Sequence, residues 1–325
     1  MFTADQARAL VRSRDDLEAE GLTSRGITDA VRSGRVVRVH PGRFVDAATW
    51  RGLYPEGRHL VRLVACDSAR RAGNAVASHV SGAVAWQLPL YRLEPRRVHL
   101  SGAGENGQVR RSEPVVARHE VAVPERDRVI RDGIPCTSLP RTVADCIRSL
   151  PMEASLSIAD AAIRAVAWDE RDHTYDEDAA ARLRAEIAAR LPVGGRGVRA
   201  ARRTLELADG RAQLPGESVS RLYLLELGFP KPRLQVPIAG PSGGWYYVDF
   251  GLDAHETWGE FDGKAKYVDP TMRSGSIERA VLEEKEREDW IRGTTKRSFA
   301  RWGTAHIPDA HTLGRRLAAF GLAAP

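Results

Sequence analysis

Hydrophobic residues in the first 45 positions recur at helical spacing and then change to the spacing of strands. Apolar stripes at 7–11 and 17–22 predict two short helices. A third helix is expected after Thr23-Ser24, which offers an N-cap, and Gly34 marks its end. The run 35–45 contains two β-rich halves around Pro41-Gly42 and predicts a small hairpin. Residues 1–48 are therefore expected to form a first domain.

The middle of the chain mixes the two patterns. Residues 49–150 contain a predicted helix at 56–72, an apolar helical segment at 77–86, strands at 98–100 and 115–117, and a strand, turn and helix at 133–145. Pro140 is suited to the N-terminal edge of that last helix. Residues 151–212 are almost wholly helical, with breaks at 169–178 and 194–195. We expect a mixed α/β domain followed by a helical connector.

A new pattern begins near residue 213 and continues to residue 325. Its predicted elements are a helix at 215–228, strands at 234–238, 245–252 and 257–264, a helix at 278–291, a strand at 298–302 and a helix at 311–320. One helix, three strands, a helix, a strand and a helix form an α/β layered domain. The expected fold class is therefore α/β and multidomain.

Composition agrees with a globular protein of two or three domains. The 325 residues are 42% apolar and 28% charged, mean hydropathy is -0.36, and no stretch approaches the ~20 apolar residues of a membrane span. The N-terminus has no signal-peptide pattern, and three cysteines are too few for a disulfide framework. We therefore expect a cytoplasmic protein with no membrane partner. The formal charge of +6 permits a polyanionic partner.

Three helices followed by a β-hairpin form a winged helix, in which the third helix enters the major groove of DNA. The hairpin contacts backbone or the minor groove. The candidate DNA contacts are Ser24, Arg25, Thr28, Asp29 and Arg32 on the helix and Arg35, Arg38, His40 and Arg43 on the hairpin. Arginine suits both phosphate contact and guanine recognition. The alternative is a solvated surface, because four acidic residues at 15–20 keep the net charge of this segment small.

Five residues of the last domain carry candidate chemistry: Glu217, Asp249, Glu260, Asp262 and Lys264. Asp249 ends an apolar run, and Glu260 and Asp262 project from one face of their strand because their spacing is two. If the two strands are antiparallel neighbours, Asp249 and Glu260 lie side by side. Clustered carboxylates repel each other unless a cation bridges them, and Mg²⁺ or Mn²⁺ prefers such oxygen ligands. Asp249, Glu260 and Asp262 are the predicted metal ligands, and the ion would activate water for phosphodiester hydrolysis.

Other polar residues favour structural roles. Ser78-His79 is interpreted as packing rather than as a nucleophile and its base, and the nine histidines show no metal-ligand spacing with cysteines. Residues 240–244 form a hairpin turn rather than a phosphate loop, because no Gly-Lys-Ser/Thr follows.

Residues 214–325 resemble the very-short-patch-repair-endonuclease-like branch of the PD-(D/E)XK superfamily. The resemblance rests on Glu217 in a leading helix, Val248-Asp249-Phe250, Glu260-Phe261-Asp262-Gly263 and the run 284–289 before Arg301-Trp302. It implies a restriction-endonuclease-like α/β/α domain. The superfamily motif (Asp/Glu)-x-Lys fits in one of two ways. With Glu260 as the acid, Asp262 occupies the lysine position; with Asp262 as the acid, Lys264 completes the motif in a shifted register.

The N-terminal two-thirds resembles the abortive-infection, AbiEi-type antitoxin family of type IV toxin–antitoxin systems, which act in phage defence. The matching segments are 21–23, 34–44, 77–83 and 133–145, in that order. The resemblance implies a winged helix, binding to double-stranded DNA, transcriptional autoregulation and a cognate toxin as partner.

Three hypotheses follow. The first is a DNA-binding regulator of antitoxin architecture with an endonuclease-like domain. The second is an active Mg²⁺-dependent DNA endonuclease targeted by the winged helix. The third is a non-enzymatic antitoxin whose last domain only binds a partner.

Overall fold

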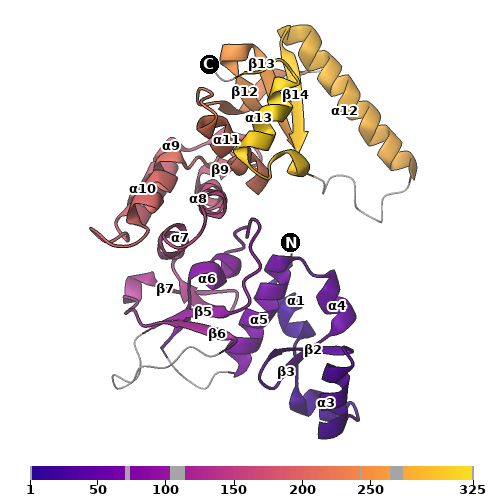
Figure 1. The fold of residues 1–325 in the computed structure, drawn as a ribbon, viewed down its shortest axis with the longest axis vertical. Helices are drawn as coiled ribbons and strands as arrows, with labels where there is room; N and C mark the ends of the chain where they lie inside the picture. The colour runs from indigo at the N-terminus through magenta and orange to yellow at the C-terminus, as the bar shows by residue number, and fades with distance from the viewer. Residues whose placement is uncertain (1, 70–73, 103–113, 242, 264–273, 324–325) are drawn as a thin grey trace. The chain divides into compact units, whose positions relative to one another are not determined.

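The computed structural model describes residues 2–69, 74–102, 114–241, 243–263 and 274–323 (Figure 1). The chain divides into two compact units, Met1–Ile158 with Ala181–Glu206, and Ala159–Ala180 with Leu207–Pro325. The described residues contain helices and several sheets, so the predicted α/β multidomain class is confirmed. The four segments predicted from the sequence divide the chain more finely than these two units. Among the described helices, none combines the length and the apolar character needed to cross a membrane.

Residues 2–46 begin unit 1 and follow the predicted order closely. The elements are α1 (Ala4–Leu10), β1 (Arg12–Ser13), α2 (Arg14–Ala19), α3 (Ser24–Arg32), β2 (Val36–His40) and β3 (Arg43–Asp46). Thr23 caps α3 by accepting a hydrogen bond from the backbone N–H of Gly26. β2 and β3 form the predicted antiparallel hairpin, and Gly42 takes the left-handed conformation that its turn requires. The two-residue strand β1 pairs with β3 and was not predicted.

A small core holds these elements together. Leu17, Ile27 and Phe44 are buried against one another, and Leu22 and Val31 pack on their edge. Each of α2, α3 and β3 contributes one buried side chain to this cluster. The polar face of α3 is consequently turned away from the core.

The rest of unit 1 is built around a five-stranded sheet. Its strands, in spatial order, are β6 (Val116–His119), β5 (Val98–Ser101), β4 (Val76–Ala77), β8 (Ile134–Thr137) and β7 (Arg128–Arg131). Helices α4 (Ala47–Gly52), α5 (Pro55–Ala69), α6 (His79–Ala85) and α7 (Leu139–Ile147) belong to the same unit. Ser138 caps α7 and Pro140 occupies its first turn, as predicted.

The predicted helix over 77–86 is wrong at its start. Val76 and Ala77 form the central strand β4, which pairs with Leu100 on one side and Cys136 on the other. The reason is physical: a short apolar run has no periodicity that separates a buried strand from a buried helix. Pairing with two neighbouring strands decides the conformation, and the helix starts only at His79.

The predicted helical segment consists of α8 (Met152–Ala167), α9 (Glu177–Ala188) and α10 (Val198–Leu207). The polar break between α8 and α9 contains a small hairpin of two strands of two residues each, β9 (Trp168–Asp169) and β10 (Thr174–Tyr175). Cys66, Cys136 and Cys146 are buried, and none of the three forms a disulfide.

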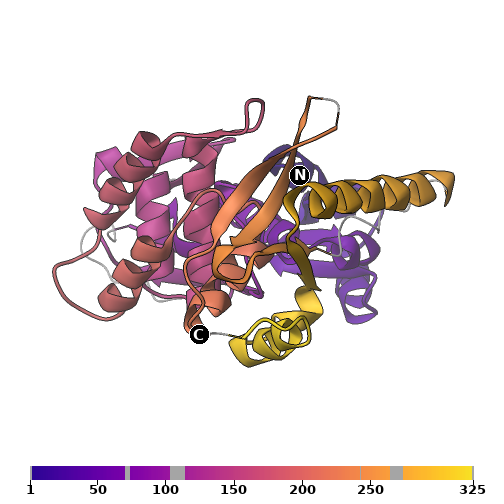
Figure 2. The same ribbon diagram turned by 90° about the horizontal axis from the view of Figure 1, so that it is seen from above.

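Unit 2 contains a four-stranded sheet in the order β11 (Arg233–Ala239), β12 (Trp245–Leu252), β13 (Thr257–Asp262) and β14 (Ser298–Gly303). The first three strands are antiparallel neighbours, whereas β13 and β14 are parallel. Parallel strands need a long crossover, and here it contains α12 (Ser274–Thr295), a long helix beside the strands (Figure 2). Helices α11 (Pro215–Glu226) and α13 (Ala310–Ala318) pack against each other.

Helices cover both faces of this sheet. Phe299 of β14 packs with Ile291 of α12, whereas the indole N–H of Trp302 donates to Ser220 of α11 over 2.8 Å. Side chains alternate between the faces of a strand, so residues 299 and 302 point to opposite sides. α12 and α11 therefore lie on different faces, and the carboxylate-bearing strands run between them.

Candidate functional site

Two predicted site residues meet in unit 2. Glu217 lies in the first turn of α11 and is only 2% exposed. Its Oε2 accepts a hydrogen bond from the backbone N–H of Gln213 at 2.8 Å. Gln235 of β11 donates from Nε2 to Oε2 of Glu217 and to Oδ1 of Asp249, each at 3.3 Å. Three elements thus place two carboxyl groups within hydrogen-bonding distance of one amide. We call Glu217 and Asp249 the carboxylate pair.

The backbone at Gln235 is unusual. Its φ of +46° lies in the left-handed region, inside an otherwise regular strand. Such a conformation costs on the order of 1–3 kcal/mol for a non-glycine residue. Residues strained in this way are found most often at functional sites. The side chain that this backbone places is the one that connects Glu217 with Asp249.

Electrostatics distinguish the carboxylate pair from ordinary surface acids. Burial and, to a smaller extent, the neighbouring Asp249 carboxylate together raise the pKa of Glu217 to about 8. Two carboxyl groups held this closely can share a proton or bind a cation, because both relieve their repulsion. Gln235 faces both carboxyl groups with Nε2, a hydrogen-bond donor, so the carboxylate oxygens themselves are the ligands that Mg²⁺ would use. Glu217 and Asp249 therefore fit a hard divalent cation.

Glu260 has a different environment. Its Oε1 lies 2.6 Å from Nη2 of Arg287 on α12, and its Oε2 lies 2.8 Å from Nη2 of Arg301 on β14. Burial raises the pKa of Glu260, while the two arginines oppose that rise. Both carboxylate oxygens are thus in ion pairs, so a metal would have to replace an arginine to bind there.

The remaining predicted residues of this site lie outside the pair. Phe250 pairs with Gly259, so β12 and β13 are antiparallel neighbours, which is the condition for Asp249 and Glu260 to lie side by side. Asp249, however, uses Oδ2 to accept the backbone N–H of Phe261 at 2.8 Å. Asp262 is 45% exposed, and its Oδ2 lies 3.9 Å from Nε of Arg301. Lys264 is outside the described residues.

The candidate DNA contacts of α3 lie on its solvent side. Ile27 and Ala30 are buried, whereas the exposed residues are Ser24, Arg25, Thr28, Asp29 and Arg32. Three of these side chains are engaged within the helix: Arg32 forms an exposed ion pair with Asp29 at 3.1 Å, and the Thr28 hydroxyl donates to the Ser24 carbonyl. α3 therefore presents a continuous polar face.

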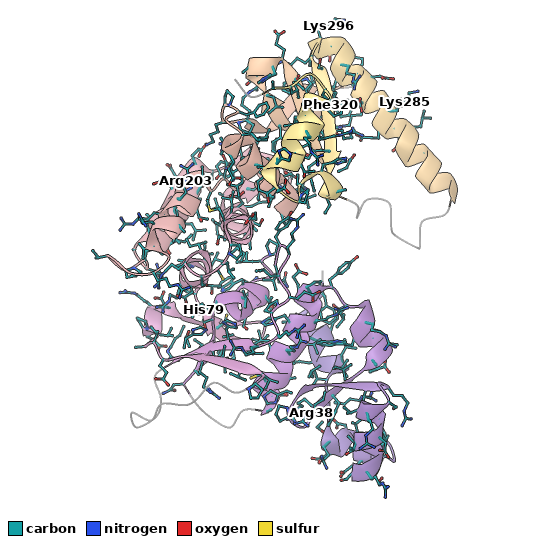
Figure 3. All side chains as sticks on the ribbon, viewed as in Figure 1. Arg38, His79, Arg203, Lys285, Lys296 and Phe320 are labelled. Carbon is teal, nitrogen blue, oxygen red and sulfur yellow. The ribbon has the colours of Figure 1, made fainter. Side chains whose placement is uncertain are left out.

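The hairpin residues differ in how firmly they are held. Arg35 and Arg38 are exposed, and Arg38 is labelled in Figure 3. His40 is half-buried, with Nδ1 3.2 Å from the Pro41 carbonyl oxygen. Arg43 donates to the hydroxyl and carbonyl of Ser68 at 3.0 and 2.9 Å, which ties β3 to α5. Arg43 thus has a structural task that the sequence did not indicate.

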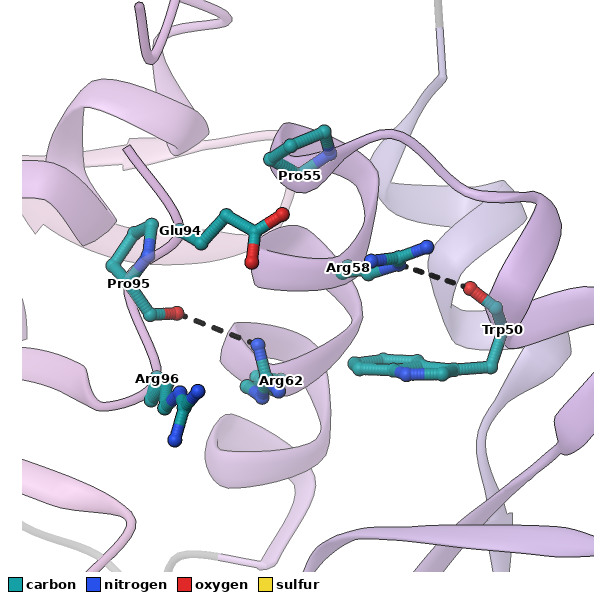
Figure 4. Close-up of a pocket in the computed structure, with 7 residues that line it drawn as sticks. All are labelled: Trp50, Pro55, Arg58, Arg62, Glu94, Pro95 and Arg96. Carbon is teal, nitrogen blue, oxygen red and sulfur yellow. Dashed lines mark hydrogen bonds between the residues drawn. The ribbon is translucent and has the colours of Figure 1, made fainter. Parts of the chain in front are cut away.

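Unit 1 also contains an arginine-lined pocket of about 380 Å³ (Figure 4). It is lined by Trp50, Pro55, Arg58, Arg62, Glu94, Pro95 and Arg96. Arg58 donates to the Trp50 carbonyl, and the Arg62 guanidinium lies 4.8 Å from the centre of the Trp50 ring. Three arginines against one glutamate give the pocket a positive charge, which suits an anionic group.

Sequence reasoning missed one cluster entirely. The side chains of His79, His99 and His119 converge in unit 1, where one ring nitrogen of each lies within 4.8 Å of those of the other two. Among the described residues, no other group of three or more His, Cys, Asp and Glu side chains meets this distance. The three positions lie on three elements and are separated by 20 residues each, so no local motif signals them.

Comparison with known proteins gives relatives but no activity. No protein-family model matches the chain. The chain is similar to two proteins of Mycobacterium tuberculosis, the uncharacterized protein MT2308 of strain CDC 1551 / Oshkosh and the uncharacterized protein Rv2248 of strain ATCC 25618 / H37Rv. Each is 29% identical over 273 residues, which cover 82% of this chain and 85% of the relative. A match of this length includes residues of both units.

Proposed function

We propose that the protein binds double-stranded DNA through a winged helix formed by α1–α3 and the β2–β3 hairpin. The single observation that carries the proposal is the exposed polar face of α3, whose apolar face is anchored by Ile27. The order of elements, with β1 pairing beside the hairpin, supports the same arrangement. In a winged helix α3 enters the major groove and the hairpin lies along the backbone or the minor groove.

The residues divide by task. Arg25 and Arg32 suit guanine edges or phosphates, and Ser24 and Thr28 suit phosphate oxygens. Arg35 and Arg38 on the hairpin supply backbone contacts, with His40 beside them. Arg43 contributes by fixing the hairpin to Ser68. A few cationic contacts give an affinity that depends strongly on salt.

A charge-matched pair of variants tests this proposal. Arg25→Ala/Arg38→Ala removes two exposed charges from the proposed interface, and Arg199→Ala/Arg202→Ala removes two exposed charges from α10. Binding of a fluorescent mixed-sequence duplex is followed by anisotropy over a series of salt concentrations. We expect the first variant alone to weaken binding and to reduce the salt slope by about 2. Equal losses in both variants would mean that only net charge matters.

For unit 2 we propose an endonuclease-like α/β/α domain. This proposal is supported by the order α11, β11, β12, β13, α12, β14 and by the positions of Glu217 on α11, Asp249 on β12 and Glu260 on β13. A second candidate function for unit 2 is cleavage of DNA, which is favoured by the carboxylate pair of buried Glu217 and partly buried Asp249. The arginines that hold Glu260 favour the regulator, because they occupy the oxygens that a metal would need.

In the cleavage hypothesis Glu217 and Asp249 hold Mg²⁺ or Mn²⁺. When bound, such an ion supplies a positive charge that activates water and stabilises charge on the scissile phosphate. Gln235 orients both carboxylates, and the backbone N–H of Phe261 fixes the second oxygen of Asp249. Arg287 and Arg301 neutralise the charge of Glu260.

Supercoiled plasmid with excess Mg²⁺ or Mn²⁺ separates the two hypotheses. Wild type is compared with Asp249→Ala/Glu260→Ala and with a matched surface control, Glu256→Ala/Glu283→Ala. Metal-dependent nicking that the first variant alone loses establishes an endonuclease. Salt-sensitive band shifts without nicking by any of these proteins would establish the regulator. If the wild type gives no band shift and no nicking, both the endonuclease and the regulator hypotheses are contradicted.

The antitoxin resemblance adds a biological setting to the regulator. A winged helix of this family would bind DNA near its own gene and repress a neighbouring toxin gene. A reporter fused to the DNA upstream of the gene tests autoregulation, with repression expected for wild type and lost in Arg25→Ala/Arg38→Ala. Full repression by that variant would contradict the proposed interface. If neither DNA binding nor cleavage is found, co-purification with a neighbouring gene product tests the partner-binding hypothesis.

A further inference from the structure

Three imidazoles from three elements of unit 1 meet at one point. His79 begins α6, His99 lies in β5, and His119 ends β6. Nδ1 of His99 lies 3.0 Å from Nε2 of His119. The rings of His79 and His119 are stacked with centroids 3.8 Å apart. His79 is labelled in Figure 3. We call these side chains the histidine cluster.

The backbone is strained in order to place one of these rings. His79 has a φ of +50°, in the left-handed region that non-glycine residues rarely occupy. Its Nδ1 lies 3.0 Å from the hydroxyl of Ser78, which in turn accepts a hydrogen bond from the buried Ser101 hydroxyl at 2.7 Å. Metal-bound histidines are commonly oriented in this way through their second nitrogen. His79 nevertheless offers one ring nitrogen within 4.8 Å of a ring nitrogen of each of the other two histidines.

All three histidine side chains are partly buried, and the cluster offers ligand atoms of one kind, imidazole nitrogens. Neutral imidazole is the form that coordinates zinc and its neighbours in the first transition series.

The register of β5 and β6 explains the approach. The strands are parallel, and Ser101 of β5 is the partner of His119 while His99 is the partner of Ala117. Val98 and Leu100, which flank His99 in β5, are buried in the core. His99 therefore points to the opposite face of the strand, where α6 begins with His79. The backbone N–H of Ser78 also donates to the His99 carbonyl at 3.0 Å, which fixes α6 to β5.

From this geometry we propose that His79, His99 and His119 form a binding site for a divalent transition-metal ion, with Zn²⁺ as the ion whose ligand preference it matches. Three imidazole nitrogens leave the fourth tetrahedral position for water or an anion, as in sites with an exchangeable ligand. The site is separate from the carboxylate pair, which offers oxygen ligands and suits Mg²⁺. The two proposals therefore stand or fall independently.

Metal uptake by the wild-type chain is the first test. The full-length protein, stripped with a chelator and then dialysed against Zn²⁺, is expected to retain one ion per chain by elemental analysis. Titration with Co²⁺ is expected to give the intense visible bands of a four-coordinate ion with nitrogen ligands. The proposal would be overturned if the wild-type protein retained no Zn²⁺ and gave no such Co²⁺ bands. This test needs no variant.

Variants then locate the ion. His99→Asn/His119→Asn removes two ligands and should abolish stoichiometric uptake, whereas His311→Asn, which changes an exposed histidine in unit 2, should leave it unchanged. Ser78→Ala keeps all three ligands and should weaken binding by about 10- to 100-fold. Circular dichroism identifies any variant that fails to fold. If the folded double variant binds Zn²⁺ and Co²⁺ as wild type does, the ion lies elsewhere and the assignment is wrong.

Discussion

Glu217 and Asp249 are connected through a single amide, because Nε2 of Gln235 lies 3.3 Å from an oxygen of each carboxyl group. Glu217 belongs to a helix and Asp249 to a strand 32 residues later in the chain. A hydrogen bond that joins two acids at a buried position compensates their repulsion only in part. This relationship leads to the first prediction, on metal ions.

Excess Mg²⁺ or Mn²⁺ should raise the melting temperature of the wild-type protein, because the ion binds only the folded carboxylate pair. At 100 times its dissociation constant, a ligand stabilises by about 2.7 kcal/mol. Asp249→Asn removes one ligand and one negative charge, so this variant should melt at the same temperature with and without the ion. Differential scanning fluorimetry in chelator and in metal measures both. An equal rise in wild type and variant would exclude the carboxylate pair as the binding site.

A buried ion pair in unit 2 gives a prediction on stability. Arg221 and Asp160 are 2.7 Å apart with side chains 0% and 1% exposed. Arg221→Ala leaves the Asp160 charge buried without its arginine, which should lower the free energy of unfolding by about 3–5 kcal/mol. Arg279→Ala, which breaks the exposed pair with Glu283, should cost less than about 1 kcal/mol. Urea denaturation of both variants checks the contrast, and similar losses would contradict it.

Gly259 predicts a packing effect. A Cβ atom at this position would lie 2.6 Å from the Trp302 ring and 3.1 Å from Cβ of Phe250. Gly259→Ala should therefore destabilise the protein by about 1–3 kcal/mol, the usual result of overpacking. Gly293→Ala, at a helical position with open space, should instead stabilise by about 0.5–1 kcal/mol. Thermal unfolding should give shifts in melting temperature of opposite sign for the two variants. Shifts of the same sign would show that the close approach of Trp302 to Gly259 leaves room for a methyl group.

His59 predicts how stability depends on pH in metal-free protein. Burial lowers its pKa from 6.5 to about 4. Between these values the unfolded chain binds a proton that the folded chain does not, so stability falls as pH decreases from 6.5 to 4. The difference corresponds to about 3 kcal/mol. His59→Gln should flatten this part of the curve relative to wild type, and His311→Asn should not. An unchanged slope in His59→Gln would contradict the assignment.

Much of the architecture could be predicted from the sequence because the deciding signals are local. The helical spacing before Gly34, the Pro41-Gly42 turn and the alternation after residue 213 each fix an element by itself. β12 and β13 are antiparallel neighbours, which is the condition under which the pattern places Asp249 and Glu260 side by side. The start of α6 did not, since pairing across three strands decides the conformation of Val76 and Ala77.

The sites were less predictable because their deciding contacts are distant in the chain. Arg287 and Arg301 reach Glu260 from 27 and 41 residues away, so no motif around Glu260 shows that its oxygens are paired. Gln235 was not singled out, because a glutamine in a strand carries no local signal. The histidine cluster forms only when α6, β5 and β6 come together.

The salt dependence of DNA binding tests the central proposal most directly. The dissociation constant of wild type for a short mixed-sequence duplex is measured by anisotropy at a series of salt concentrations. With contacts from Arg25, Arg32, Arg35 and Arg38, the logarithm of the affinity should fall against the logarithm of salt concentration with a slope of about -3 to -4. A slope near zero, or no binding at low salt, would contradict DNA binding by α3 and the hairpin.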